Sequence, residues 1–371
     1  MISSSDINHK RNKVFAYNVP GIALSKTLTV LFKLLHYVLL LDVGIYEYKT
    51  FKNKCIVKFL TIATGVSVSI VYFCLIATVL RKNAFFYWFY VLFISQYMII
   101  VFIFTLSNGM SFTDYYKMLL RFDAKYQINS NNYYFNIKII LVIIISILNR
   151  IGMAIIYCSY YTKNCYEMSF SQIIFVLPWL TRDVILIMNV FLFYVTYCRI
   201  TKFPALLENT KNVGSLRNSY KLIVDSLEKT QKPFDFVFTI SLVFNIPEIM
   251  LSIYFTLLQV IHSHFLEVAP TLSISYFSIT HSVVLILAPS LCAGVLPWKT
   301  NTIKIVLHDK LFLEKDKNSA RNIKLFIKYI EARPLKLRAC NLVPLDFSLP
   351  VIVLNLCVTY LIVIVQFSHL S

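Results

Sequence analysis

The chain has 371 residues, of which 58% are hydrophobic, and a formal net charge of +18. A soluble protein of this length has about 45–50% apolar residues, so the composition excludes that class. Nucleic-acid-binding proteins also carry a large positive charge, but here the lysines and arginines gather in loops between apolar segments. That distribution is typical of membrane proteins. We therefore expect a lipid bilayer as partner and no nucleic acid.

The apolar segments predict helices rather than strands. Glycine and proline are scarce, with seven and eleven residues, and the alternation of a β-barrel is missing. Seven segments reach the roughly 20 residues that a helix needs to cross a bilayer. We predict an all-α polytopic membrane protein with seven transmembrane helices, at about residues 56–80, 85–107, 137–161, 170–200, 236–261, 272–296 and 347–368.

The N-terminal residues differ from the rest of the chain. Residues 1–55 are polar and basic, and they include one apolar stretch, Leu28–Leu41, that Lys33 and His36 interrupt. This pattern favours an amphipathic helix on the membrane surface over a spanning helix. We expect these residues to form a cytoplasmic N-terminal segment.

Charge predicts the orientation. Lysines and arginines are concentrated in the N-terminal segment and in the loops after the second, fourth and sixth segments. By the positive-inside rule the N-terminus is cytoplasmic and the C-terminus is extracellular. G-protein-coupled receptors have the opposite orientation, and the Asp-Arg-Tyr and Asn-Pro-x-x-Tyr motifs of that class are missing. The sequence also lacks the inverted repeat of many secondary transporters.

Two of the basic loops are expected to be helical. Apolar residues recur at helical spacing among the lysines of both loops: Leu216, Tyr220, Ile223 and Leu227 in the first, and Ile323, Phe326, Ile327 and Ile330 in the second. We predict cytoplasmic helices whose apolar faces pack against the membrane surface or a neighbouring subunit.

Four ionisable residues lie near the middle of apolar segments: Arg150, Arg182, Asp183 and Glu248. A charge in mid-bilayer costs several kcal/mol unless it is paired or hydrated. The simplest arrangement has the third, fourth and fifth segments facing one another, with Arg150 paired to Asp183 or Glu248. The group then forms either a buried ion-pair clasp or part of a ligand cavity, and these two roles are compatible.

Other polar and aromatic residues of the apolar segments form a second group. Its members that we expect to line an outward-facing pocket are Gln96, Tyr157, Trp179, Tyr254 and His281. An aromatic belt at the membrane interface is the alternative explanation for several of them. The sequence contains no metal-spaced cluster of His and Cys and no catalytic or phosphate-binding motif. We therefore predict no enzyme activity, cofactor or metal.

The last apolar segment carries a polar residue near its end. Helical spacing places Thr359, Val363 and Gln366 on one stripe, and Tyr360 and Phe367 on the next. An amide this far into an apolar span needs a partner. Gln366 therefore either bonds to another helix or lines a water-filled pore, and the sequence does not decide which stripe would face that pore.

This segment resembles the signature of insect gustatory receptors, which are related to insect odorant receptors. The resemblance rests on Thr359-Tyr360, five apolar residues and then Gln366-Phe367, with Arg333-Pro334 and Leu345-Asp346 in the approach. It implies a seven-span, ligand-gated, non-selective cation channel that detects a small-molecule tastant. Four subunits, identical or mixed with other gustatory receptors, would assemble in the plasma membrane of gustatory or other chemosensory neurons.

The resemblance also implies roles for residues. Gln366, Phe367, Val363, Thr359 and Tyr360 would be pore or gate residues. The sugar-receptor branch has Glu after the tyrosine where this chain has Leu361, which favours a bitter or orphan receptor over a sugar receptor.

The implied regions are an N-terminal segment at 1–55, a six-helix ligand-binding domain at 56–296 that includes the cytoplasmic loop 201–235, a cytoplasmic anchor at 297–346 and a pore-lining helix at 347–371. Two alternatives remain open at this point. One is a secondary transporter with Arg150, Asp183 and Glu248 as a coupling relay, and the other is a non-conducting co-receptor subunit.

Overall fold

The computed structural model describes residues 51–79, 84–106, 112–128, 132–161, 170–210, 212–262, 265–340 and 342–368. The predicted surface helix at Leu28–Leu41 lies outside these residues. The helices are α3 (Phe51–Val79), α4 (Ala84–Leu106), α5 (Phe112–Lys125), α6 (Asn132–Tyr161), α7 (Phe170–Ile200), α8 (Phe203–Asn209), α9 (Val213–His262), α10 (Phe265–Leu313), α11 (Lys317–Ala332) and α12 (Ser348–Ser368).

Each predicted apolar segment lies in a helix. Among the described residues, α7, α9 and α10 carry stretches long and apolar enough to cross a bilayer. Shorter apolar stretches lie in α3, α4, α6 and α12. The helical class is therefore confirmed, and three of the segments are long and apolar enough to span a bilayer, while the number of crossings and the orientation stay predictions.

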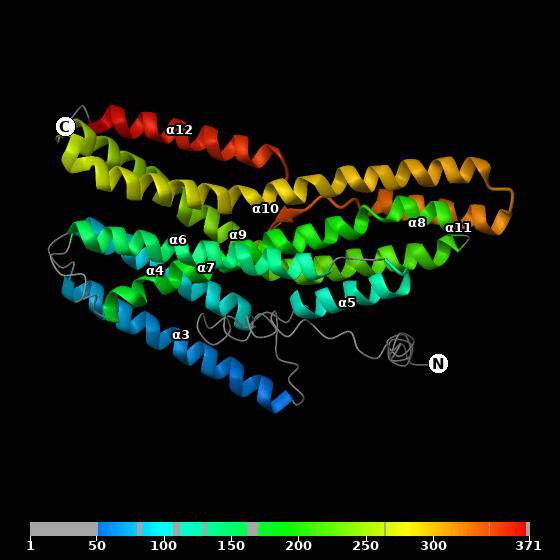
Figure 1. Ribbon diagram of the computed structural model, residues 1–371, viewed down its shortest axis with the longest axis horizontal. Helices are drawn as coiled ribbons and strands as arrows, with labels where there is room; N and C mark the ends of the chain where they lie inside the picture. Colours follow the sequence, from blue (N-terminus) through cyan, green and yellow to red (C-terminus); the bar gives the residue numbers. More distant parts are fainter. Residues whose placement is uncertain are drawn as a thin grey trace, which may run out of the picture.

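Helix α7 is the centre of the bundle (Figure 1). Every residue from Thr181 to Asn189 is buried, so α7 is enclosed on all sides along this stretch. It packs against α6, α9 and α10. A helix that is apolar all round is expected to be enclosed in this way, and the sequence of α7 fits that rule apart from its few polar residues.

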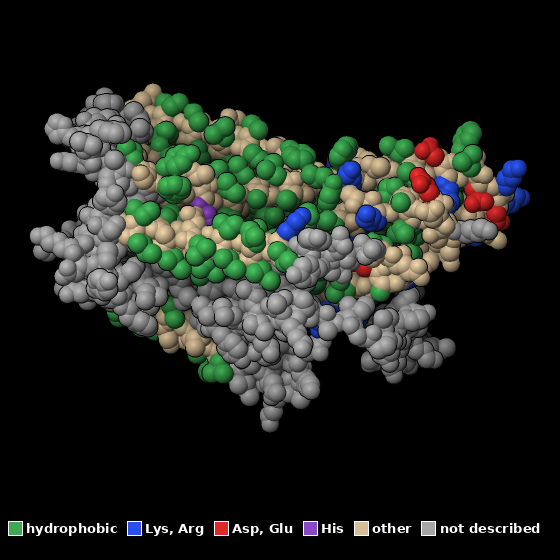
Figure 2. All heavy atoms as spheres, viewed as in Figure 1, with side chains coloured by type: hydrophobic (Ala, Val, Ile, Leu, Met, Phe, Trp, Pro, Cys, Tyr) green, Lys and Arg blue, Asp and Glu red, His purple; other side chains and the backbone are tan. Residues whose placement is uncertain are grey.

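Side chains of different kinds occupy the two ends of the molecule, which we call the apolar end and the polar end. Apolar side chains cover the end formed by α3, α6, α12 and the first part of α10, whereas lysines, arginines and acidic residues gather around α8, α11 and the end of α10 (Figure 2). Large apolar residues such as Phe59 of α3, Leu148 of α6 and Val351 of α12 are exposed. Such a surface requires lipid or other apolar partners around it.

Both predicted loop helices are present: the second is the separate helix α11, whereas the first is continuous with a predicted span in α9. Helix α9 has 50 residues and begins well before its predicted span, and α10 has 49 residues and continues beyond its predicted span, so both reach into the polar end. At roughly 1.5 Å per residue, α10 is about 74 Å long. The helix continues because its buried face does: Leu296, Ile303 and Leu307 are all fully buried.

One short sheet departs from the all-α prediction. Strands β1 (Arg338–Ala339) and β2 (Val343–Pro344) pair antiparallel, with Ala339 opposite Val343. They form a hairpin between α11 and α12, and β1 packs against α9. Cys340 at the turn has φ 51°, and it accepts a hydrogen bond of 3.3 Å from the Thr239 hydroxyl of α9.

The hydrophobic core extends into the polar end. The Tyr220 ring of α9 lies 5.4 Å from the rings of Phe203 and Phe326, between α8 and α11. Burial raises the pKa of Tyr220 to about 12, so its phenol is neutral at physiological pH. A buried ion pair of 2.7 Å joins Arg199 of α7 to Asp123 of α5. These contacts hold the basic loops in one packed unit.

Candidate functional site

The mid-span charges meet at the bundle centre. Arg150 of α6 donates two hydrogen bonds to Asp183 of α7, from Nε to Oδ2 at 2.6 Å and from Nη2 to Oδ1 at 3.0 Å. The Asp183 side chain is fully buried and that of Arg150 nearly so. Two parallel bonds between a guanidinium and a carboxylate are the strongest geometry for such a pair. Of the two partners predicted for Arg150, Asp183 and Glu248, the structure shows Asp183.

Arg182 forms a second ion pair, which joins α7 to α9. Its Nη1 donates to Glu248 Oε2 at 3.0 Å and to the amide oxygen of Asn245. Its Nε lies 3.6 Å from Asp183 Oδ1. Because Arg182 and Asp183 are adjacent in the chain, α7 turns one charge toward α6 and the other toward α9. The four charges cancel, as the cost of burying an unpaired ion demands.

Two further residues complete the cluster. His281 of α10 lies with Nε2 3.0 Å from Asp183 Oδ2. The Arg150 guanidinium carbon lies 5.7 Å from the centre of the Trp179 ring, within the range of a cation–π contact. We call Arg150, Trp179, Arg182, Asp183, Asn245, Glu248 and His281 the charged cluster. It joins α6, α7, α9 and α10, so any shift among these helices changes its contacts.

Access to the charged cluster is one-sided. The side chains of Glu248 and His281 are 18% and 13% exposed, whereas those of Arg150, Arg182 and Asp183 are at most 4% exposed. The Glu248 carboxylate and the His281 imidazole are therefore the more accessible of these ionisable groups. Nothing in this arrangement resembles a nucleophile with its base. Among the described residues, no group of three His, Cys, Asp or Glu could hold a metal ion.

The remaining predicted pocket residues lie apart. Gln96 is buried on α4, where its Nε2 has no partner among the described residues. Tyr254 is half-buried on α9, six residues beyond Glu248. The side chain of Tyr157 lies outside the described part of the structure. Asn245 was missed by the sequence analysis, although its position three residues before Glu248 on a helix places both on one face.

Helix α12 has few contacts along its length. Leu349 in its first turn is 2% exposed, but Val351, Leu354 and Tyr360 are all more than half exposed. In Figure 1 α12 lies at the edge of the bundle beside α10. An apolar helix exposed on this scale needs lipid or other subunits as neighbours.

The predicted pore residues are in the C-terminal half of this helix. Val363 is 38% exposed, and Gln366 is exposed as well. Thr359 is exposed and donates its hydroxyl to the Asn355 carbonyl at 2.8 Å, within the helix. The side chain of Phe367 is not among those described. Gln366 therefore forms no helix–helix hydrogen bond with the described part of this chain, which disfavours one of the two roles that the sequence left open.

The start of α12 is capped by Asp346. Its Oδ1 accepts hydrogen bonds from the Ser348 backbone N–H at 2.9 Å and from the Ser348 hydroxyl at 2.5 Å. These bonds favour the carboxylate and lower the pKa of Asp346 below its ordinary value. The cap also places a negative charge at the positive end of the helix dipole.

We expect this cap to make stability acid-sensitive. Because the folded pKa is below the unfolded one, the stabilisation is present above about pH 3.9 and is lost as pH falls through the folded pKa. Thermal unfolding in detergent between pH 3 and 6 measures this loss. Asp346→Asn should remove the part of the acid dependence that Asp346 causes. Identical pH profiles of the variant and the unchanged protein would contradict the assignment.

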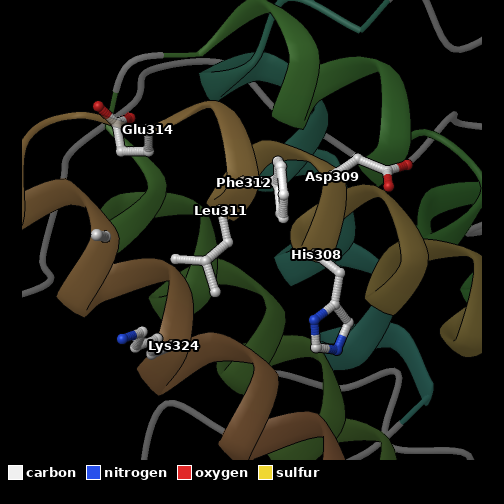
Figure 3. Close-up of a pocket in the computed structure, with 7 residues that line it drawn as sticks. His308, Asp309, Leu311, Phe312, Glu314 and Lys324 are labelled. Carbon is white, nitrogen blue, oxygen red and sulfur yellow. The ribbon is translucent and has the colours of Figure 1, made fainter.

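A separate hollow lies at the polar end. It has a volume of about 550 Å³ (Figure 3). Its lining includes His308, Asp309 and Phe312 of α10, Glu314 of the α10–α11 connection and Lys324 of α11. Along α10 it is 27 residues, or roughly 40 Å, from His281. The hollow is open, and its charged side chains face solvent. We therefore regard the charged cluster and α12 as the candidate site.

Comparison with known proteins finds a similar architecture among solved structures. No protein-family model matches the sequence, and no curated protein matches it. A solved structure does match: that of the insect olfactory receptor OR5 from Machilis hrabei, with a TM-score of 0.61 over 92% of this chain and 99% of that one. The chain shares the fold of that receptor. Their sequences are only 12% identical, so the likeness concerns the path of the chain.

Proposed function

We propose that the chain is a subunit of a ligand-gated, non-selective cation channel that detects a small extracellular tastant. The observation that carries this proposal is α12, an uncharged apolar helix that is fixed at its first turn and exposed beyond it. The fold likeness to an olfactory receptor supports the same class. Four subunits in the plasma membrane of a chemosensory neuron would bring four copies of α12 around one pore.

The regions of the chain follow from this proposal. Residues 56–296 hold the ligand, 297–346 form the cytoplasmic anchor, and 347–371 line the pore, with 1–55 on the cytoplasmic side. Ligand binding near the charged cluster favours a conformation in which the α12 copies separate. Gln366 and Val363 then face the ion path, because moving apolar side chains off the axis lets water in. Leu361 favours a bitter or orphan ligand over a sugar.

Current recording from cells that express this chain alone tests the proposal. We expect unitary cation openings when a panel of bitter compounds is applied. Small saturating currents without unitary openings would instead indicate a transporter, for which the charged cluster could relay ions. If current appears only after a second receptor is co-expressed, the chain is a co-receptor subunit. G-protein activation without any current would contradict all three.

A further inference from the structure

Gly294 is a point of unusually close approach between α10 and the start of α12. A Cβ atom at this position would lie 3.2 Å from Cδ2 and Cε2 of the Phe347 ring and 3.2 Å from the Phe347 backbone nitrogen. A ring can rotate away from such a contact, but a backbone atom cannot. Glycine within a helix costs about 0.5–1 kcal/mol relative to alanine, so its presence here requires a packing reason. The closeness of Phe347 is that reason.

The residues around Phe347 hold the chain in place. Leu345 is 1% exposed and donates its backbone N–H to the Leu337 carbonyl at 3.0 Å. Asp346 caps α12, and Leu349, three residues later, is buried. Beyond this turn most side chains of α12 are exposed. The final helix is thus held at its first turn, and beyond it only one stripe, which includes Val353, Cys357 and Leu361, is half-buried.

The same α10 helix connects this contact to the charged cluster. His281, which bonds to Asp183, precedes Gly294 by 13 residues, or roughly 20 Å of continuous helix. Pro289 lies between them and removes one intrahelical hydrogen bond, so α10 can bend there. The helix is nevertheless unbroken from His281 to Gly294, so a displacement at His281 has a continuous path to the first turn of α12.

We infer that Gly294 is a positioning residue for the final helix: its lack of a side chain seats Phe347 against α10 and makes this contact the pivot through which α10 sets the angle of α12. This inference rests on the proposed channel function for its role in gating. The position of α12 itself does not depend on that function, and it can be measured separately.

Gly294→Ala in the full-length protein tests the pivot. Gly152→Ala is the matched control, since it places the same methyl group in a membrane helix where no described atom lies within 4 Å. Spin labels at the exposed positions Val284 on α10 and Leu354 on α12 report the distance between the two helices. We expect Gly294→Ala to shift this distance distribution, and Gly152→Ala to leave it unchanged. An unshifted distribution in a folded Gly294→Ala protein would overturn the inference.

The ligand-free current gives the second measurement. A displaced α12 destabilises the closed conformation, in which Phe347 packs against Gly294. We therefore expect Gly294→Ala to raise the ligand-free open fraction about tenfold, a typical size for coupling between sites. The double variant Gly294→Ala/Phe347→Ala removes two of the three close contacts and should return the distance part of the way. No return would show that Phe347 is not the partner. If the distance shifts and no variant conducts, the channel proposal fails while the pivot stands.

Discussion

Replacing Asp183 by leucine is expected to lower the free energy of unfolding by about 3–5 kcal/mol, the usual cost of removing one partner of a buried ion pair. Asp183 accepts from Arg150 and lies within reach of Arg182 and His281, all in the apolar interior. Its loss leaves Arg150 charged and without a carboxylate. We expect little folded protein at the cell surface. Denaturation of purified protein in detergent, together with surface labelling, measures the effect.

Two comparison variants separate the loss of a buried charge from a general effect of mutation. Glu331→Leu breaks the Lys304–Glu331 pair, which is 2.6 Å long but about one-third to one-half exposed, and it should cost much less stability than the loss of Asp183. Arg150→Met combined with Asp183→Leu removes the stranded charge and should recover part of the stability. Wild-type stability in the single Asp183→Leu variant would show that the cluster is not an ion-pair clasp.

Gln366→Leu is expected to reduce single-channel conductance about tenfold, which corresponds to ~1.4 kcal/mol added to the barrier for permeation. Gln366 is exposed near the end of α12 and has no helix–helix bond with the described part of the chain. In a pore its amide would contact water and ions, whereas leucine would favour dewetting of the constriction. Single-channel recording in symmetrical sodium or potassium solutions measures this change.

A substitution on the same helix provides the control for Gln366. Val351→Leu enlarges an exposed apolar residue in the first turn of α12, 15 residues away from Gln366. It should leave unitary conductance unchanged. If Gln366→Leu channels carry ions with wild-type conductance and selectivity, Gln366 does not line the pore. A neighbouring stripe of α12, which includes Tyr360, would then be the candidate lining.

The sequence predicted the charged cluster in part. The cost of a charge in mid-bilayer was enough to predict that Arg150, Arg182, Asp183 and Glu248 gather and neutralise one another. It was not enough to choose between Asp183 and Glu248 as the partner of Arg150. That choice depends on which face α7 turns toward α6, and the ionic cost is the same in either pairing. The structure pairs Arg150 with Asp183 and Arg182 with Glu248.

The membrane class, the seven apolar helices and the positions of their charges were determined by the sequence alone, because hydropathy and helical spacing are local properties. Three features required the tertiary structure: the continuation of α9 and α10 into the polar end, the exposure of α12, and the seating of Phe347 on Gly294. Each depends on contacts between segments far apart in the chain. In the sequence, Gly294 only indicates a residue that destabilises a helix. The first turn of α12, which packs beside it in the structure, shows why a side chain there would not fit.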